Sequence, residues 1–305
     1  MKKVLIFGIN GYLGGLSAAA LYNDGWEVDG VGTTEHVDKN LNKMVVKYIR
    51  IKSRIAEIDL NLSDYSNILF CISLNHNESE TDYRHTIDIN CGILADIIQA
   101  SKLNSSSTKI LYLSTMQVYK EQNFECNITD PTNIYGYTHL ACEQLLKLYG
   151  NASILRLSNV YGPPQTERAN IGWTLIADLC QSIAEHNVME IKNDGTAVRN
   201  FLFCEDFQAL LVNLISNSDY RYMVYNVVGK TTSTIGGIKH ILQMIANANG
   251  KNITVKVPKN YVISSEKKLT NIQPNLKEDA DKSYLVGNTG LLEGLSKTIK
   301  FYEEA

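Results

Sequence analysis

The chain has 305 residues, 29 basic against 32 acidic side chains, and a hydrophobic content of 44%. At roughly 150 residues per domain, this length allows two lobes or one large α/β unit, and the apolar content excludes a disordered chain. The net charge of -3 provides no electrostatic basis for binding nucleic acid or an anionic membrane. We therefore expect a globular protein that binds a small ligand.

The sequence shows no sign of a membrane or metal-binding function. The longest early apolar run, Val4–Phe7, is far too short for a signal-peptide core or a transmembrane helix. Six cysteines lie at positions 71, 91, 126, 142, 180 and 204, without a C-x-x-C pair or a histidine at zinc spacing. We expect buried, reduced thiols, no metal and a cytoplasmic location.

Apolar strand-like runs alternate with helical stretches through the first half of the chain. We expect strands at Val4–Phe7, Glu27–Val31, within Met44–Ile51, and at Ile68–Ile72, Lys109–Leu113 and Ser153–Leu157. We expect helices at Leu13–Asn23, Ile87–Ser101 and Tyr137–Tyr149. Such a pattern indicates an α/β fold with a doubly wound parallel sheet that is covered on both faces. Ligands of these sheets bind at the carboxyl ends of the strands.

A glycine-rich loop, Gly8-Ile-Asn-Gly11-Tyr-Leu-Gly14, lies between the first expected strand and the first expected helix. Small residues let such a loop approach a pyrophosphate, whose charge the amides at the helix N-terminus stabilise. The loop therefore predicts dinucleotide binding, with contacts from Gly8, Asn10, Gly11, Tyr12, Leu13 and Gly14. The spacing G-x-x-G-x-x-G resembles that of the short-chain dehydrogenase/reductase superfamily.

The end of the second strand predicts which dinucleotide is bound. An acidic residue there favours NAD, because its carboxylate accepts a hydrogen bond from the ribose 2′-hydroxyl. Here the acidic position falls on Gly32, and the hydroxyls of Thr33 and Thr34 could donate to a 2′-phosphate. NADP(H) is therefore slightly favoured over NAD(H), and NAD(H) stays open because no arginine follows directly.

Further motifs follow in chain order. They are Leu113-Ser-Thr115-Met-Gln-Val118-Tyr119, Tyr135-Gly-Tyr-Thr-His139, Arg156-Leu-Ser-Asn159-Val-Tyr-Gly162 and Asp194-Gly195-Thr-Ala-Val-Arg199. With the glycine loop, they resemble the extended short-chain dehydrogenase/reductases, the NAD-dependent epimerase/dehydratase family that acts on nucleotide sugars. The resemblance extends from Gly8 to about Asp281.

The resemblance implies how the chain is divided. It implies a Rossmann-like fold in which residues 1–165 bind NAD(P). Residues 166–305 would form a smaller C-terminal lobe that binds the nucleotide sugar. A segment at about 196–228 would return to the first domain. Composition is compatible with this division, because the apolar pattern loosens after Gly162-Pro163-Pro164.

The resemblance also implies roles for single residues. Thr115 and Tyr135 occupy the family's catalytic positions, and Thr115, Asn159 and Arg199 its substrate-contacting positions. Arg199 would contact the pyrophosphate through its paired donors. Ser73 and Leu74 would line the cofactor groove, and Asn90 matches a position that supports the active-site helix.

His139 replaces the lysine that the family carries four residues after its tyrosine. A tyrosine with an ordinary pKa of about 10 needs phenolate stabilisation to act as a base near neutrality, and the lysine's charge supplies it. A histidine, with an ordinary pKa of about 6.5, could gain a proton beside a phenolate. We expect His139 to take over the lysine's catalytic role and, with Tyr135, its contact with the cofactor.

Two absences narrow the reaction. Met116 and Gln117 occupy the acid and base positions of the family's dehydratases, which disfavours a 4,6-dehydratase. Gln117 also replaces the cysteine of fucose-synthase-like enzymes, which argues against 3,5-epimerisation. A 4-keto-sugar reductase using NADPH is favoured, and a C-4 epimerase or 4-dehydrogenase with tightly bound NAD stays open. Residues 273–275 and 281–283 loosely resemble a segment of the 4-keto-sugar reductases.

The loss of the lysine also leaves a second class of protein open, a cofactor-binding or regulatory module with weakened or lost catalysis. The family resemblance further suggests a homodimer built from the helices at Ile87–Ser101 and Tyr137–Tyr149. Leu140, Leu145 and Leu148 are compatible with such an interface and equally with a core.

Overall fold

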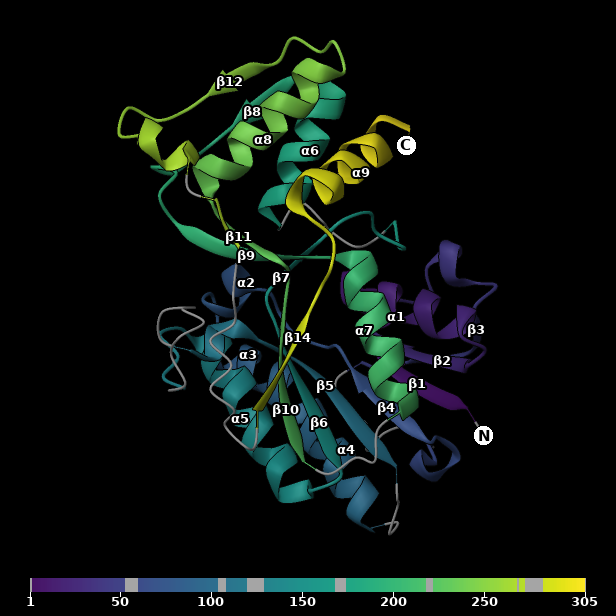
Figure 1. Ribbon diagram of the computed structural model, residues 1–305. Coiled ribbons are helices and arrows are strands. Elements are labelled where there is room, and N and C mark those ends of the chain that lie inside the picture. The colour runs from purple at the N-terminus through teal and green to yellow at the C-terminus, as the bar shows by residue number, and fades with distance from the viewer. Residues whose placement is uncertain are drawn as a thin grey trace.

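An eight-stranded parallel sheet forms the centre of the larger lobe (Figure 1). The computed structural model describes residues 2–52, 60–103, 108–119, 129–167, 174–217, 222–267, 269–271 and 282–304. The strands are β1 (Lys3–Phe7), β2 (Glu27–Gly32), β3 (Val45–Arg50), β4 (Asn67–Phe70), β5 (Lys109–Thr115), β6 (Ala152–Leu157), β10 (Met223–Val228) and β14 (Lys282–Val286). Their spatial order is β14-β10-β6-β5-β4-β1-β2-β3, and all neighbours run parallel. This confirms the expected doubly wound sheet.

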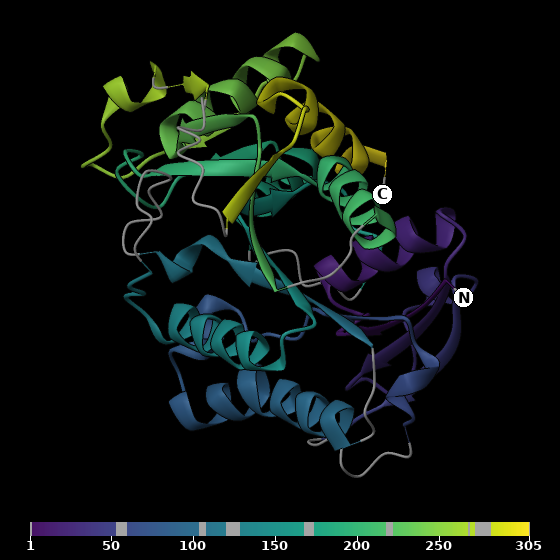
Figure 2. The same ribbon diagram turned by 60° about the horizontal axis from the view of Figure 1, so that its bottom comes forward.

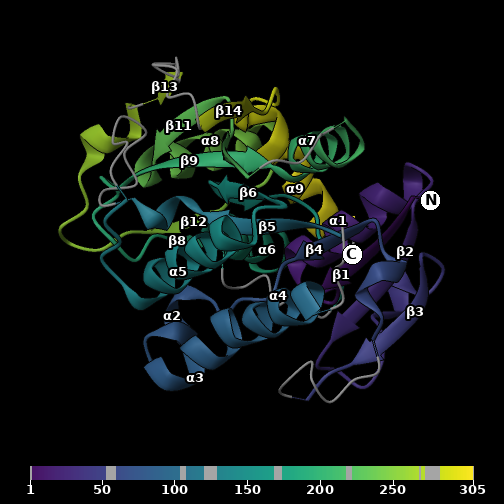
Figure 3. The ribbon, with the colours of Figure 1, turned by 90° about the horizontal axis from the view of Figure 1, so that it is seen from below.

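Helices cover both faces of this sheet, as its apolar strands require. Helices α1 (Tyr12–Asn23) and α7 (Cys204–Asn217) lie on one face, and α4 (Ile93–Leu103) and α5 (Ile134–Tyr149) on the other (Figure 2). Figure 3 shows α4 and α5 side by side across the sheet. Side chains of β1 alternate between the two resulting cores, with Val4 and Ile6 in one and Leu5 and Phe7 in the other.

The smaller lobe is built from the second half of the chain. A four-stranded sheet has the order β13 (Leu269–Asn271), β11 (Thr231–Thr234), β9 (Val198–Phe203), β7 (Asn159–Tyr161), and β12 (Thr254–Lys256) pairs with β8 (Val188–Glu190). Helices α6 (Leu175–His186), α8 (Ile235–Ala248) and α9 (Leu291–Glu304) pack with these strands above the large sheet (Figure 1). Because β10 and β14 return to the large sheet, the chain crosses between the lobes repeatedly, and the division at residue 165 stays a prediction.

Short helical turns complete the described fold. They are η1 (Lys39–Leu41), η3 (Leu62–Asp64), α2 (His76–Ser79), α3 (Tyr83–Ile87), the π-helical η4 (Asp88–Gly92), η5 (Met116–Val118) and η7 (Ile263–Lys267). No helix among the described residues combines the length and the apolar character needed to cross a membrane.

Two element boundaries differ from the expected ones, with consequences for the site. The helix expected from Tyr137 begins at Ile134, because the side chain of Asn133 caps it by accepting from the Gly136 amide at 2.8 Å. Tyr135 therefore lies in the first turn of α5. The helix expected from Ile87 begins with the π-helical turn η4, which holds Asn90.

A buried ion pair fixes α5 on the sheet. Glu143 of α5 and Arg156 of β6 are 0% and 4% exposed, with Arg156 Nε 3.0 Å from Glu143 Oε1. Ser114 of β5 donates to the same carboxylate at 2.6 Å. Arg156 Nη1 donates to the Tyr119 hydroxyl at 2.7 Å, which donates to Asn226 of β10 at 2.8 Å. Burial by itself would lower the pKa of Arg156, but hydrogen bonds and charge from Glu143 raise it.

Replacing Arg156 by Met should lower the free energy of unfolding by about 3–5 kcal/mol, because the Glu143 carboxylate would stay buried without a counter-charge. Urea denaturation followed by circular dichroism measures this loss. The double variant Glu143→Leu/Arg156→Met serves as the control and should recover most of the stability, because it removes both charges. A loss of less than about 1 kcal/mol in the single variant, the range of exposed ion pairs, would contradict the assigned role.

Candidate active site

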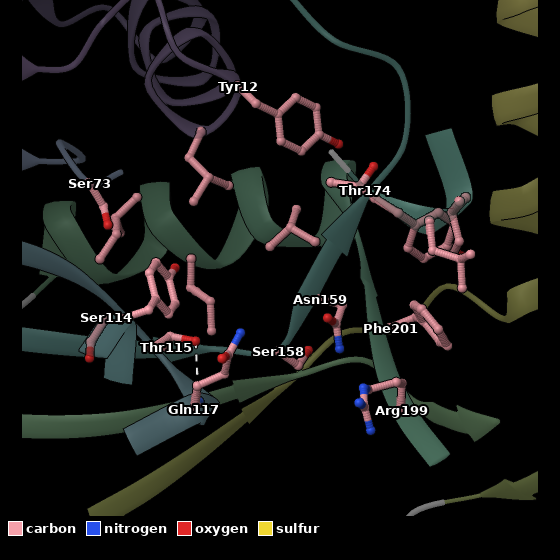
Figure 4. A pocket seen from close by; sticks show the side chains of 18 of the residues that line it. Tyr12, Ser73, Ser114, Thr115, Gln117, Ser158, Asn159, Thr174, Arg199 and Phe201 are labelled. Atoms are coloured by element: carbon pink, nitrogen blue, oxygen red, sulfur yellow. Dashed lines mark hydrogen bonds between the residues drawn. The ribbon is translucent and has the colours of Figure 1, made fainter. Parts of the chain in front are cut away.

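A cavity of about 440 Å³ lies at the carboxyl ends of the strands, between the two lobes (Figure 4). Its walls come from the start of α1, the ends of β4, β5 and β6, the first turns of α5, and the strands β7 and β9 of the smaller lobe. This is where a doubly wound sheet binds its ligands. Eight predicted site residues line it: Tyr12, Leu13, Ser73, Thr115, Tyr135, His139, Asn159 and Arg199.

The glycine loop has the geometry that a pyrophosphate site requires. Gly8 has a positive φ of 82°, and its carbonyl accepts from the Gly11 amide at 2.9 Å. A Cβ at Gly14 would collide with the Gly8 carbonyl, so only glycine allows α1 to begin this close to β1. Gly11 caps α1 without a side chain, which leaves the first amides of the helix without a side-chain acceptor. The residues therefore fit a dinucleotide phosphate at this helix terminus.

A second polar cluster lies at the end of β2, away from the cavity lining. Asn10 donates to Thr34 Oγ1 and to the carbonyl of His36. The Tyr48 hydroxyl lies 2.9 Å from Thr34 Oγ1, and it is the group that a Cβ at Gly32 would meet. No acidic side chain therefore originates at the position that reads the ribose.

The structure also brings a cation to this cluster that the sequence did not indicate. Arg50, the last residue of β3, donates through Nε to the carbonyl of Thr33 at 3.4 Å. The side chain is exposed. The sequence has no arginine directly after β2, and Arg50 lies on the neighbouring strand. Only the pairing of Arg50 with Gly32 shows that the two strand ends meet.

The loop after β5 and the start of α5 bring Thr115 and Tyr135 together. Thr115 ends β5, and its Oγ1 accepts from the Gln117 amide at 3.2 Å, which leaves the hydroxyl proton to donate elsewhere. A Cβ at Gly136 would collide with the carbonyl of Gln117, so this glycine allows the close packing. Burial raises the pKa of Tyr135, and hydrogen bonds with Thr115 and Ser73 act in the opposite direction.

His139 lies one turn along α5 from Tyr135, with the two ring centroids 4.5 Å apart. It is 3% exposed, and burial lowers its pKa to about 3. Its Nδ1 lies 2.7 Å from the hydroxyl of Tyr112, and its Nε2 lies 3.1 Å from Ser73 Oγ. Burial therefore favours the neutral ring near pH 7, because a buried imidazolium would lack solvation, and this argues against the expectation that His139 gains a proton beside the phenolate.

The π-helical turn η4 supports this arrangement from behind. The Asn90 side chain accepts from the Leu74 amide at 2.8 Å and donates to Thr138 Oγ1 at 3.0 Å. It therefore ties the loop that carries Ser73 to the turn of α5 that carries His139. This is the supporting position that the sequence resemblance implied for Asn90.

The opposite wall of the cavity carries Asn159 and Arg199. Asn159 on β7 donates to the carbonyl of Asn200 at 2.8 Å, which ties it to β9 beside Arg199. Arg199 donates to the carbonyl of Val198 at 2.8 Å, and burial lowers its pKa. Among the described residues, no carboxylate forms a salt bridge with Arg199. Figure 4 shows both side chains on the side of the cavity facing away from Ser73.

Several residues at the site were not predicted from the sequence. Tyr112, in the middle of β5, looks like an ordinary core residue in the sequence. Its hydroxyl reaches His139 because α5 packs on the sheet at this point. Phe201 and Ser158 also line the cavity, although Ser158 lies within the quoted motif that begins at Arg156 and was given no role. Of the two reductase-like segments, 273–275 and the first residue of 281–283 lie outside the described residues, whereas Lys282 and Ser283 begin β14. Among the described residues, no three His, Cys, Asp or Glu side chains cluster as metal ligands.

The fold and the cavity define a dinucleotide-binding α/β protein with a second lobe over the strand ends. Residues 4–228 match the family described as "NAD dependent epimerase/dehydratase family", and the chain belongs to this family. This confirms that it is of the extended short-chain dehydrogenase/reductase type.

Relatives of the chain have several activities. It is 27% identical over 154 residues to a trifunctional UDP-glucose 4,6-dehydratase/UDP-4-keto-6-deoxy-D-glucose 3,5-epimerase/UDP-4-keto-L-rhamnose-reductase of Arabidopsis thaliana, covering 47% of this chain and 22% of that protein. It is 24% identical to the UDP-glucose 4-epimerase of Corynebacterium glutamicum, over 87% of this chain and 88% of that one. The UDP-glucuronic acid 4-epimerase of Bacillus cereus, solved with UDP-glucuronic acid and NAD, has the same fold, with a TM-score of 0.74, 21% identity and 99% of each chain covered.

Proposed function

We propose that the protein is a reductase of a 4-keto nucleotide sugar, which delivers hydride to C-4 and a proton to O-4. The observation that carries this proposal is the neutral, buried His139 where the family has a cation. Without that cation, the pKa of Tyr135 is raised by burial, and its phenol keeps its proton at neutral pH. A protonated phenol is an acid, which is the form that a reduction uses.

The direction of the reaction follows from where the proton starts. A bound nicotinamide cofactor supplies the hydride that adds to the carbonyl carbon. The Tyr135 phenol donates its proton to the carbonyl oxygen, and Thr115 donates a hydrogen bond to the Tyr135 oxygen. Oxidation of an alcohol would need the phenolate first, which this site disfavours. The phenol regains its proton from solvent through the open cavity.

The proposed substrate class rests on the far wall of the cavity. Arg199 has no carboxylate partner among the described residues, so its donors are available to an anionic pyrophosphate. Asn159, tethered beside it, offers a side-chain oxygen to a sugar hydroxyl. The plant relative's reductase activity acts on a UDP-linked keto sugar, which supports this class; because the chain spans only 22% of that relative, the substrate stays a proposal.

Purified protein with NADPH should reduce at least one member of a panel of nucleotide-linked 4-keto sugars, measured by loss of absorbance at the NADPH band and by product analysis. Tyr135→Phe should lower turnover by about 10²–10⁴-fold, because it removes the proton donor. Tyr137→Phe is the matched control, since Tyr137 is 53% exposed on the same helix and lies outside the cavity lining. No turnover with any panel member would contradict the proposed reaction.

Replacing His139 by Lys should change the pH dependence of both reaction directions. A cation one turn from Tyr135 would lower the pKa of its phenol by about one to three units. Reduction, which needs the protonated phenol, would then be lost at a lower pH, whereas oxidation of the product alcohol near pH 8 would become faster. Initial rates from pH 6 to 10 measure both changes, with the neutral His139→Gln as control. Coincident profiles for His139→Lys and the wild type would argue against a neutral His139.

A C-4 epimerase with tightly bound NAD is the second candidate, favoured by the similarity to a UDP-glucose 4-epimerase over most of both chains. Such an epimerase would keep NAD bound through purification. Mass spectrometry of the purified protein would then detect NAD although no cofactor had been added. The third candidate is a cofactor-binding or regulatory module without catalysis. It would bind the cofactor but transfer no hydride to or from a nucleotide sugar.

We propose NADP(H) as the preferred cofactor, on the basis of the cluster at the end of β2. Gly32 offers no carboxylate to repel a 2′-phosphate. Thr33 offers a hydroxyl donor, whereas the Thr34 hydroxyl already donates to the His36 carbonyl at 2.8 Å, and Arg50 places a guanidinium beside Thr33. The relative solved with NAD is 21% identical and speaks only to the shared fold.

Arg50→Ala should therefore weaken NADPH binding by about tenfold and leave NADH binding unchanged, because only the 2′-phosphate loses a charged partner. Fluorescence titration of both reduced cofactors measures the two dissociation constants. Arg84→Ala, which removes another exposed arginine that pairs with Asp88 and lies outside the cavity lining, is the control. Equal effects of Arg50→Ala on both cofactors would contradict the preference.

The expected homodimer and the cytoplasmic location stay predictions. Leu148 and Tyr137 on α5 are 76% and 53% exposed, and Ile87 at the end of α3 is 45% exposed. A second copy packing on these helices would bury such apolar side chains. Sedimentation velocity distinguishes the dimer from a monomer.

A further inference from the structure

We propose that the Tyr112 hydroxyl is a positioning group of the active site: it holds His139 as the tautomer protonated on Nε2, so that the ring is a neutral hydrogen-bond donor to Ser73 and, through Ser73, to Tyr135. This inference rests on the proposed role of Tyr135 as proton donor. It adds a residue from the middle of β5, buried beneath α5, to a site that otherwise lies at the strand ends.

The tautomer follows from counting protons along the chain of contacts. Ser73 has one hydroxyl proton, which it donates to the carbonyl of Leu74 at 2.9 Å. With the Ser73 proton on the Leu74 carbonyl, we assign Nε2–H of His139 as the donor in its 3.1 Å contact with Ser73 Oγ. A neutral imidazole has one proton, so Nδ1 carries a lone pair and accepts from the Tyr112 hydroxyl at 2.7 Å. Every donor in this chain then has an acceptor.

The same chain can respond when Tyr135 gives its proton away. Ser73 is a hydrogen-bond partner of Tyr135 as well as of His139. When the phenolate forms, Ser73 can turn its proton from the Leu74 carbonyl to the phenolate oxygen while still accepting from His139 Nε2. The phenolate then has two neutral donors, Ser73 and Thr115, in place of the family's cation. The opposite tautomer of His139 would take the Ser73 proton for itself and remove one of them.

Tyr112 is suited to orient the ring and unsuited to carry a proton onward. It is 1% exposed, and burial raises its pKa well above the ordinary value, so it stays a phenol. A proton relay that ended on Tyr112 would leave a buried phenolate without a counter-charge. The hydrogen-bond chain therefore polarises the site without conducting protons.

Among the described residues, the cavity that His139 lines contains one charged side chain, Arg199, on the opposite wall. Glu143, the nearest carboxylate on α5, is paired with Arg156 of β6. The other titratable groups that face this region are Tyr112 on β5, Cys71 after β4, Cys91 on η4, His76 on α2, and Tyr135 and Cys142 on α5. The tyrosines and thiols among them are neutral in their ordinary forms near pH 7, and His76 lies beside Tyr135.

The tautomer is measured directly on the cofactor-free protein labelled with ¹⁵N-histidine, by long-range ¹H–¹⁵N correlation spectra from pH 5 to 8. His139→Gln assigns the signal. We expect His139 to stay neutral and protonated on Nε2 throughout this range. A wild-type ring protonated on Nδ1, or one that becomes charged above pH 5, overturns the inference. This measurement needs no substrate, so it decides the inference even if the proposed reaction is wrong.

Tyr112→Phe then tests the consequence, because it removes only the hydroxyl. We expect a mixture of His139 tautomers, a fall in kcat of about tenfold with little change in KM, and an alkaline limit of reduction moved to higher pH. Tyr65→Phe is the matched control: Tyr65 is also a buried tyrosine, but its hydroxyl donates to Asp29, away from the cavity. Identical tautomers and pH profiles in the two variants overturn the proposal.

Discussion

The buried pair of Glu143 and Arg156 is the interaction on which the geometry of this protein depends. It joins α5 to β6, and through Ser114 and Tyr119 it also joins the end of β5 and, through Asn226, β10. Helix α5 carries Tyr135 and His139 on the turns before Glu143, and β5 ends at Thr115 directly after Ser114. The distance between Tyr135 and Thr115 therefore depends on a charge pair that does not line the cavity. Both charges are buried, so neither can exchange its partner for water. A shift of α5 along the sheet would therefore leave a buried charge unpaired.

This fixed framework makes the nature of position 139 decisive. A lysine there would bring a cation to the tyrosine, whereas the histidine brings a neutral ring with two fixed hydrogen bonds. Low dielectric strengthens both kinds of contact, but only the cation lowers the pKa of the tyrosine by charge. With histidine in place of lysine, Tyr135 is therefore expected to be a phenol before the reaction, where the lysine would favour a phenolate. That difference connects one residue in α5 to the direction of hydride transfer proposed for the protein.

The sequence predicted the large sheet, its helices and eight of the 21 residues that line the cavity, because these depend on local patterns: apolar runs, the glycine loop and ordered motifs. It failed where a residue's role depends on a partner distant in the chain. Arg50 reaches Thr33 only because β3 pairs with β2. Tyr112 has the same apolar neighbours as any core strand residue, and its hydroxyl is assigned only by the packing of His139 above it. The effect of burial on the pKa of His139 was missed for the same reason, since the spacing of a motif does not show burial.

By itself, the sequence determined the fold class, the family and the identity of the groups available for chemistry: a tyrosine and a threonine without the lysine. The tertiary structure decided what those groups can do. It buried His139, which lowers the ring's pKa to about 3, and it set Tyr112 on one nitrogen and Ser73 on the other. The physical reason is that a pKa and a tautomer are properties of solvation and of neighbours in space. The lowered pKa and the single tautomer arise only when the helix has packed on the sheet.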